Sequence, residues 1–387
     1  MRARNVLLAL VIIAAGMTIT ASRRGVFADL SRRISRAADL AARLVASSGP
    51  TMRWHELERS SRRLPADGAA SLVIENPYGE VSVVGGSQSF VGIEAVRWGA
   101  GNEPEEARAT APRAGLVTSR AGDAIIVKVA GEDTVRQRVH LHLSVTAPSG
   151  LDLEIKALAG PVSVHDMSGG VKVERMAGDV TVTGAARVAV AGGSGRTELR
   201  EIRGPVDAKI LAGLIKLADI DGEVNAETAA GDIQALNLKG PVTARTVSGT
   251  ITLDLYAGAN ASLNTTSGDA YASLANPLTG HLSAKSVSGN VTVKLPPGSD
   301  YAFDISSEAR RISTRDFHQT SGRSAPDHLV GVVGTGRGRL ELRSVTGTVS
   351  LVGEWIPQPP RALWRLDIIP RCYALVGEWI PQPPRAF

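Results

Sequence analysis

Two histidines stand two residues apart in the segment RVHLHLSVTAP, at His140 and His142. Side chains two positions apart on a β-strand point to the same side of the sheet, so this segment predicts two imidazoles on one face. A structural zinc ion takes four ligands, and these histidines supply only half of them. We therefore favour ordinary surface or edge histidines over a metal site.

Aspartates follow glycines at Asp179, Asp232 and Asp269, which raises the question of calcium. Calcium-binding β-rolls repeat Gly-Gly-x-Gly-x-Asp every nine residues, and this chain does not, so the sequence argues against calcium. Two glycine-rich segments, GGSGR (192–196) and GTGRGR (334–339), resemble phosphate-binding loops only in composition. Neither precedes a predicted helix, so we do not expect them to bind phosphate.

The densest acidic stretch has five carboxylates: Asp207, Asp219, Asp221, Glu223 and Glu227. Some β-solenoid enzymes cleave acidic polysaccharide with acids or bases clustered on one face. A polysaccharide-active enzyme is therefore an alternative, and it requires three or so acids to converge in one groove. A solvated charged face explains the same residues. We predict no catalytic, cofactor-binding or metal-binding residues, and no enzymatic activity.

The elements that would position these groups form an internal repeat. Eight glycines recur at spacings of 17 to 21 residues, most often 18: Gly160, Gly178, Gly195, Gly213, Gly231, Gly249, Gly268 and Gly289. A second series lies half a period away: Gly170, Gly204, Gly222, Gly240, Gly258, Gly280 and Gly298. The repeat is therefore a coil of about 18 residues built from two half-units of about nine.

Each half-unit alternates apolar and polar residues, which assigns its two faces. We expect the apolar pairs to point inward: Val162/Val164, Val171/Val173, Val180/Val182, Val188/Val190, Ile215/Leu217, Ile251/Leu253 and Val291/Val293. We expect the residues between them to point outward: Ser163, Lys172, Thr181, Lys216, Thr252 and Thr292. Nine residues leave no room for a crossover helix, so stacked coils must share one core. The sequence therefore predicts an all-β fold, a parallel β-solenoid with coils about 4.8 Å apart.

The corner of each coil has a structural explanation that needs no ligand. In KSVSGNVTVKL (285–295), Gly289 suits a sharp bend that needs positive φ, and Ser288 is small enough for the corner and able to bond the local backbone. This register also predicts that Val291 is buried and Thr292 is exposed.

The rhythm is weaker before the solenoid repeats (151–355) and again within them past residue 298. Residues 66–150 predict an irregular β region, the opening rungs or cap of the solenoid, with a polar loop at 99–115. Past residue 298, YAFDISSEARRISTRDF (301–317) predicts a coil that has lost its corner glycine. GRLELRSVTGTVSLVGEW (338–355) then predicts one clean final rung.

Composition agrees with a core of many small layers. The 387 residues are 43% hydrophobic but only 4% aromatic, and the single cysteine, Cys372, excludes an intrachain disulfide. Residues 1–65 hold twelve arginines against four acids, a surplus of eight positive charges. Because the whole chain carries +5, the remainder carries −3. The repeat body therefore lacks the surplus of positive charge that would attract nucleic acid.

The N-terminal residues predict export, with membrane contact through residues 1–47. Residues 6–21, VLLALVIIAAGMTITA, form an apolar run behind two arginines, so we expect 1–22 to be a signal peptide or a retained membrane anchor. Residues 23–65 predict a basic amphipathic helix and linker, which could lie on anionic lipid or be a solvated stalk. We expect the processed chain to be periplasmic, membrane-anchored or on the cell surface.

The last residues, 356–387, predict an extended Pro-rich tail. The segment LVGEWIPQPPRA occurs twice without a mismatch, at 351–362 and 375–386. The offset of 24 is not the solenoid period, so a very recent duplication or a sequence-assembly error explains it better than a structural repeat.

The chain resembles the exported DUF4097-type "putative adhesin" family of β-strand repeats. The resemblance rests on LVIENPYGEVSVVG (72–85), LSVTAPSGLDLEIKALAGPVSV (143–164), the Ser-Gly corners at 248–250, 267–269 and 288–290, and GRLELRSVTGTVSL (338–351). It implies a parallel β-solenoid in the cell envelope or outside the cell, with no catalytic residues to transfer. Alanine replaces serine at several corners, and SSEARR replaces a Ser-Gly corner, which argues against a uniform ladder of ligand sites.

Together these features predict a non-enzymatic, exported envelope protein that serves for binding, adhesion or as a scaffold, without a cofactor. Its partner would be an envelope polysaccharide or a protein. A self-assembling scaffold, stacked end to end through exposed terminal rungs, is a further alternative.

Overall fold

The computed structural model describes residues 53–110, 115–130, 138–256, 260–315 and 321–353. The predicted signal peptide or anchor, residues 23–52 of the predicted basic segment, and the Pro-rich tail lie outside this part of the chain. The predicted helix and linker do not extend to residue 65. Arg53–Pro65 instead form strand β1, because their backbone pairs antiparallel with β4 (Phe90–Gly101).

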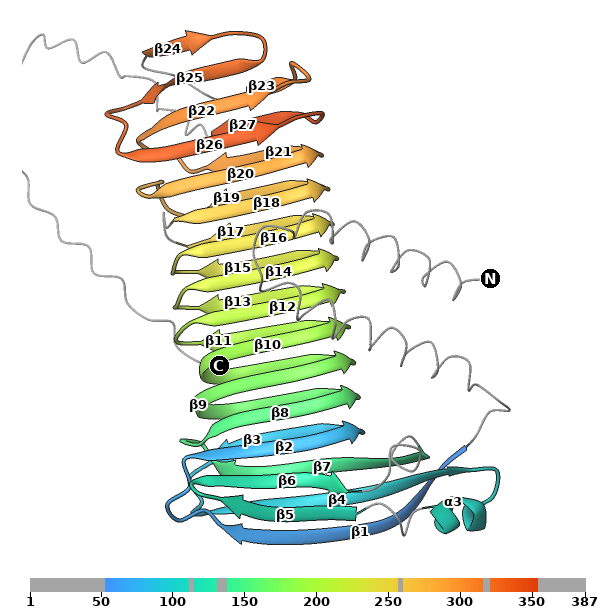
Figure 1. The fold of residues 1–387 in the computed structure, drawn as a ribbon. Helices are drawn as coiled ribbons and strands as arrows, with labels where there is room; N and C mark the ends of the chain where they lie inside the picture. Colours follow the sequence, from blue (N-terminus) through green and yellow to red (C-terminus); the bar gives the residue numbers. More distant parts are fainter. Residues whose placement is uncertain (1–52, 111–114, 131–137, 257–259, 316–320, 354–387) are drawn as a thin grey trace, which may run out of the picture. The chain divides into compact units, whose positions relative to one another are not determined.

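The strands form two hydrogen-bonded ladders that share one core, and each central coil contributes one strand to each ladder (Figure 1). We call the first ladder face A. In spatial order it contains β5 (Gly115–Ala121), β6 (Ala124–Ala130), β2 (Ser71–Tyr78), β8 (Asp152–Ala159), the second halves of β9 (Val162–Ala177) and β10 (Val180–Ser194), β12 (Val206–Ala212), β14 (Val224–Ala230), β16 (Val242–Ser248), β18 (Ala261–Ser267), β20 (His281–Ser288), β26 (Gly338–Ser344), β22 (Tyr301–Ser307), β25 (His328–Val333) and β24 (Ser321–Ser324).

We call the second ladder face B. In spatial order it contains β1, β4, β7 (Val139–Pro148), β3 (Val81–Gly86), the first halves of β9 and β10, β11 (Thr197–Ile202), β13 (Ile215–Ile220), β15 (Ile233–Leu238), β17 (Ile251–Leu255), β19 (Ala270–Leu274), β21 (Val291–Leu295), β27 (Val349–Gly353) and β23 (Ile312–Arg315). The prediction of a parallel β-solenoid is confirmed.

The core is the line of inward apolar pairs from both faces. Every predicted pair is buried, with at most 3% of any of these side chains exposed. Val291 is fully buried, and Thr292 points outward and is half-buried. The predicted register is therefore right. Full burial of each such side chain contributes about 1.5–3 kcal/mol.

The corner glycines stack directly on one another, which adds a reason for glycine beyond the bend. Gly249 has φ +146°, and a Cβ built there would lie 2.1 Å from the carbonyl oxygen of Gly231 on the preceding coil. The same close approach recurs along the predicted series, and it extends to Gly79 at one end and Gly347 at the other. A side chain at these positions would force neighbouring coils apart.

At both ends of the solenoid, one rung is inserted out of sequence order. The rung β2–β3 lies between β6–β7 and β8–β9. At the other end β26–β27 lies between β20–β21 and β22–β23. Figure 1 shows each inserted rung as a colour out of sequence with its neighbours. The rung predicted to be final is therefore the last in sequence but not the last in space.

Beyond the inserted rungs the pairing becomes antiparallel. Antiparallel pairs join β1 to β4, β4 to β7 and β5 to β6 at one end, and β22 to β25 and β25 to β24 at the other. Within residues 66–150, only part of the predicted cap therefore consists of solenoid rungs. The predicted polar loop at 99–115 instead contains helix α3 (Pro104–Thr110), whose Ala107 is buried next to Gly99 of β4.

Candidate binding face

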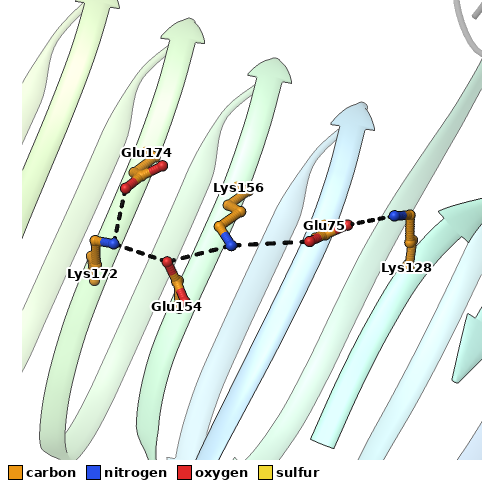
Figure 2. Close-up of polar contacts among 6 residues, drawn as sticks. All are labelled: Glu75, Lys128, Glu154, Lys156, Lys172 and Glu174. Carbon is orange, nitrogen blue, oxygen red and sulfur yellow. Dashed lines mark hydrogen bonds and ion pairs between the residues drawn. The ribbon is translucent and has the colours of Figure 1, made fainter. Parts of the chain in front are cut away.

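Charged side chains project from neighbouring strands of face A and form a continuous ladder of alternating sign. Lys128 of β6 pairs with Glu75 of β2 at 3.0 Å, and Lys156 of β8 lies 4.0 Å from Glu75 and 3.5 Å from Glu154. Figure 2 shows how the ladder continues onto β9. Parallel in-register strands produce this ladder, because they place equivalent side chains one above another.

Lys172 of β9 closes the ladder by bonding two carboxylates. Its Nζ lies 2.9 Å from Glu154 and 2.9 Å from Glu174 (Figure 2). The hydrogen bond from Lys172 is the main cause that lowers the pKa of Glu154, and the bonds to Glu174 and Glu154 raise the pKa of Lys172. These groups are therefore ionised at neutral pH, and each donor or acceptor has a fixed position on the face.

The ladder is interrupted at β10, where alanines occupy both outward positions. Ala189 lies between Lys172 and Asp207 in the register, and Ala191 lies between Glu174 and Lys209. Beyond this gap the charges resume. Asp207 pairs with Lys209 at 2.9 Å, and Glu227 of β14 pairs with Arg245 of β16 at 3.1 Å.

A groove of about 540 Å³ runs over face A across the gap, from β2 to β14. We call it the axial groove, because it crosses successive strands along the stack. One wall carries Glu154, Lys172, Ala189 and Asp207, and the other carries Asp152, Gly170, Arg187 and Glu223. Its volume lies within the range of small-molecule and cofactor sites.

The second wall depends on a glycine. Arg187 reaches from β10 to Asp152 on β8, and its Nη2 lies 2.7 Å from the carboxylate. A Cβ at Gly170 would lie 2.4 Å from Nε of Arg187, so a side chain there would displace the arginine from its path across the intervening strand. Asp152 also accepts a hydrogen bond from the backbone N–H of Gly170 at 2.7 Å, which fixes that carboxylate.

Face B carries a different surface. Its register aligns Ser144 of β7, Ser82 of β3, Ser163 of β9 and Thr181 of β10 on four successive strands. One ion pair, between Glu198 and Lys216 at 3.9 Å, joins the next two strands. Farther along, the same position returns to hydroxyl side chains: Thr252, Tyr271, Thr292, Ser350 and Ser313. Hydroxyl groups, rather than a charge ladder, therefore dominate this face.

The two predicted histidines do share the outer side of β7, but they pack against aromatic rings. The His140 ring stacks on Trp54 with centroids 3.8 Å apart, and the His142 ring lies 5.8 Å from that of Trp98. Desolvation, with a smaller contribution from His142, lowers the pKa of His140 to about 4. His140 is therefore neutral at physiological pH. Sequence reasoning missed the cluster because Trp54 fell in the segment predicted as linker.

The aspartates considered for calcium serve the backbone instead. Asp179, Asp232 and Asp269 each accept a hydrogen bond, at 2.7–2.8 Å, from the backbone N–H of the equivalent corner residue on the next coil. Asn290 accepts the same bond from Thr348 at 3.0 Å. Each side chain therefore joins two coils. Among the described residues, no group of three or more histidine, cysteine, aspartate or glutamate side chains is placed to hold a metal ion.

Buried hydroxyls form a second line of bonds between coils, just inside the corner. Thr246 donates to the carbonyl of Gly231 at 3.1 Å, Ser286 to Gly268 at 3.1 Å and Ser344 to Gly289 at 2.9 Å. The prediction assigned the local hydrogen bond to Ser288, and this assignment is wrong. Ser288 is exposed, and Ser286, two residues earlier, is the buried donor.

Arg175 occupies the equivalent position on β9, where it is 3% exposed. Its guanidinium donates to the carbonyl oxygens of Gly178 and Ser194, the latter at 2.7 Å, and burial lowers its pKa to about 10. The segment 192–196 therefore supplies carbonyl groups to an internal arginine.

The loop at 334–339 does gather backbone N–H groups around an anion, but that anion belongs to the chain. Asp300 accepts bonds from the N–H of Thr335 at 2.7 Å, from Gly336, and from Arg337 at 3.3 Å. The hydroxyl of Thr335 also donates to Asp300, and it is the main cause that lowers the pKa of this carboxyl. The carboxylate already fills the place that a phosphate would need.

The five acids of the densest acidic stretch do not converge. Asp207 and Glu227 lie on face A, Asp219 lies on β13 of face B, and Asp221 and Glu223 lie in the corner between them. Asp219 has φ +56°, accepts a bond from Asn237 and shapes the end of its strand. Asp221 pairs with Lys239 at 2.7 Å. Two of them, Asp207 and Glu223, nevertheless line the axial groove together with Asp152 and Glu154, while Asp219, Asp221 and Glu227 lie elsewhere.

Comparison with known proteins identifies a family. A family model described as Toastrack DUF4097 matches residues 115–352, more than half of the chain. No curated protein matches the sequence. Within the described residues, no helix has the length and apolar character needed to cross a membrane.

Three solved structures are similar at low identity. A "putative adhesin" from Parabacteroides merdae is 13% identical, with 76% of this chain and 96% of that chain covered and a TM-score of 0.30. A "putative adhesin" from Bacteroides fragilis is 11% identical, with 77% and 97% covered and a TM-score of 0.29. A "putative cell adhesion protein" from Clostridium sporogenes is 9% identical, with 78% and 100% covered and a TM-score of 0.19.

Proposed function

The chain belongs to the Toastrack DUF4097 family, and from that premise we propose that it is an exported, non-enzymatic envelope protein whose solenoid presents face A as a binding surface. The observation that carries this proposal is the axial groove. It lies on a stack of hydrogen-bonded strands, and its polar walls are held in place by ion pairs. A rigid face with fixed donors and acceptors is suited to recognition.

The aspartates and histidines considered from the sequence for metal binding, together with Asp300 and Arg175, are consistent with the same proposal. The corner aspartates, Asp300 and Arg175 are occupied by bonds that hold the fold together. The histidines are packed against tryptophans. Catalytic groups need freedom to meet a substrate and a pKa suited to proton transfer, and bonds to the backbone of the next coil provide neither.

End-to-end assembly receives less support, because arginines without an acidic partner among the described residues lie at both ends. Arg53, Arg62 and Arg63 belong to edge strand β1, and Arg311 and Arg323 lie at the other end. Charged edges oppose pairing with another chain, and stacking these two ends would bring like charges together.

The proposal is tested with the full-length chain expressed with a C-terminal tag. We expect mass spectrometry to show either a processed N-terminus near residue 22 or an intact chain in the membrane fraction. We also expect purified protein to be retained on washed envelope fragments without releasing soluble sugar. A chain found only in the cytosol and not retained would contradict export and binding, and released reducing ends would contradict the non-enzymatic role.

A further inference from the structure

The axial groove is long and open, and both walls carry charged side chains, although most of its exposed lining surface is apolar. It crosses β2, β8, β9, β10, β12 and β14, so at about 4.8 Å per strand it extends roughly 24 Å. The side chains of Lys172, Arg187 and Asp152 are 53%, 62% and 52% exposed, so a ligand in the groove can reach their polar atoms. A site of this length fits a chain molecule better than a single small ring.

The walls place acceptors and donors in zones along the groove. Both β8 residues, Asp152 and Glu154, are acids, and both groups that pair with them, Arg187 and Lys172, are bases. On the far side of Ala189 the walls carry the acceptors Asp207 and Glu223, and the amide of Asn225 donates to Asp207 at 2.9 Å. A ligand along the axis therefore meets acceptors, then donors, then acceptors.

Charge complementarity decides the class of ligand. The two bases are already neutralised by Asp152 and Glu154, and Asp207 is neutralised by Lys209. A polyanion would meet the carboxylates at both ends, and a polycation would meet the bases in the middle. An uncharged ligand with many hydroxyls avoids both repulsions, because each hydroxyl both donates and accepts a hydrogen bond.

The space in the groove exists because two central positions carry very small residues. Ala189 stands where neighbouring coils carry Lys172 and Asp207, and Gly170 has no side chain at all. The groove floor is the backbone of strands whose side chains Leu153, Val171 and Val188 point into the core. Ordered strands make this floor rigid, so binding would order little of the protein.

We propose that the axial groove binds an uncharged polysaccharide chain lying along the solenoid axis, with its hydroxyls bonded to the ion-paired walls. This inference rests on the proposed binding function and names the ligand of the same face. Ala189 and Gly170 provide the space, and Asp152, Glu154, Lys172, Arg187 and Glu223 provide the hydrogen bonds.

The test is affinity electrophoresis of the full chain in gels that contain one polysaccharide each. The probes are a soluble β-glucan and a galactomannan, with polygalacturonate as the polyanion and chitosan as the polycation. We expect retardation by at least one neutral polymer, and weaker or no retardation by the charged ones. Retardation by polygalacturonate or chitosan alone would overturn the proposal.

Two variants assign the binding to the groove. Ala189→Trp fills it, and Ser262→Trp places the same side chain in the equivalent outward column of β18, beyond the groove. We expect Ala189→Trp to weaken retardation at least tenfold and Ser262→Trp to leave it unchanged, with the folding of both verified by circular dichroism. Glu223→Ala, whose exposed side chain makes no bond to the described residues, should weaken it about threefold.

Equal effects of the two tryptophans would overturn the groove as the site. If Ala189→Trp loses every neutral polysaccharide yet is still retained on envelope fragments, the ligand proposal stands, and the envelope is bound by an additional surface. If the unmodified chain is retained on envelope fragments but by none of the neutral polymers, the ligand proposal fails and the binding function remains. If the unmodified chain is neither retained on envelope fragments nor retarded by any neutral polymer, the proposed binding function is wrong as well.

Discussion

The central coils and the two ends of the solenoid bury their apolar side chains through different patterns of strand pairing. From β10 to β19, each coil pairs with the coils directly before and after it in sequence. At the ends, the inserted rungs β2–β3 and β26–β27 pair with strands distant in sequence. The centre is therefore a nearest-neighbour array, whereas each end must close a long loop before it gains its contacts.

The inserted rungs explain how a stack of parallel strands can stop. A parallel ladder that ended on its last coil would expose a complete unpaired edge. At the C-terminal end the chain passes one coil position and fills it later with β26–β27. At the N-terminal end it builds β2–β3 first, adds β4–β7 outside them and then resumes at β8. Each inserted rung is therefore covered on both sides. The outermost pairs are antiparallel except on face B at the C-terminal end, where β23 pairs parallel with β27. At the other end, β1 places four arginines on the free edge. The ends thus depend on long-range pairing, and the centre on tight local geometry.

The largest effect is expected from a methyl group at a central corner. In Gly249→Ala the Cβ would lie 2.1 Å from the Gly231 carbonyl, at a φ of +146°, so the coils must separate. We expect a loss of at least about 3 kcal/mol in unfolding free energy, measured with denaturant. Gly298→Ala, at φ +79° with open space around it, is the control, and it should cost only about 1 kcal/mol. Similar losses would show that glycine is needed there for the bend alone.

The second prediction separates an inserted rung from a central one. Leu342 of β26 and Leu263 of β18 are both fully buried, so each change to alanine should cost about 2–5 kcal/mol. Leu342 lies between β20 and β22. We therefore expect Leu342→Ala to lower hydrogen-exchange protection together across 301–353, while Leu263→Ala acts mainly on its neighbouring coils. Protection lost evenly along the chain in both variants would remove the distinction between ends and centre.

Low pH should destabilise the N-terminal end before the other end, because the folded state holds His140 in its neutral form. Its pKa is about 4 in the folded chain and about 6.5 when unfolded. The folded state thus binds fewer protons between these values, and stability falls as pH drops from about 6.5 to 4, by at most about 3 kcal/mol. Asp300, at the other end, has a lowered pKa, so its contribution is lost only below about pH 4.

The measurement is the exchange protection of β7 amides at pH 6.5 and pH 4.5, compared with that of β22. We expect β7 to lose more protection than β22. His140→Phe, which keeps an aromatic ring next to Trp54, should abolish the difference. If the pH dependence persists in that variant, another group at this end is responsible.

The coils could be predicted from sequence because each buried pair repeats a local pattern. The alternation of Val291, Thr292 and Val293 fixes a face without knowledge of any neighbour. The order of the rungs at the ends could not be predicted, because the rung at 338–355 has the same pattern whether it lies last or is inserted. The axial groove could not be predicted from the sequence either. Lys172 was correctly placed outward, but its pairing with Glu154 depends on the register between coils, and the gap at Ala189 reads as an ordinary small residue.

The smallest predicted change in stability concerns the hydroxyl side chains buried just inside the corner. They are present in the coils toward the C-terminus and absent from those toward the N-terminus. In the register, Thr228, Thr246, Thr265, Ser286 and Ser344 occupy the position that Arg175 and Ala157 fill nearer the N-terminus. Thr246 bonds the Gly231 carbonyl, whereas the hydroxyl of Thr228 is buried without a partner. The two threonines are thus alike in burial and shape, but only one makes the bond.

Valine keeps the shape of threonine and removes only the hydroxyl. Thr246→Val should therefore lower the unfolding free energy by about 1 kcal/mol, because the Gly231 carbonyl loses its donor. Thr228→Val should be neutral or slightly stabilising, because it removes a buried polar atom that has no partner. Denaturant titration of both variants measures the difference directly. Equal losses would mean that the hydroxyls contribute through packing, and that the coils toward the C-terminus are held together no differently from those built around Arg175.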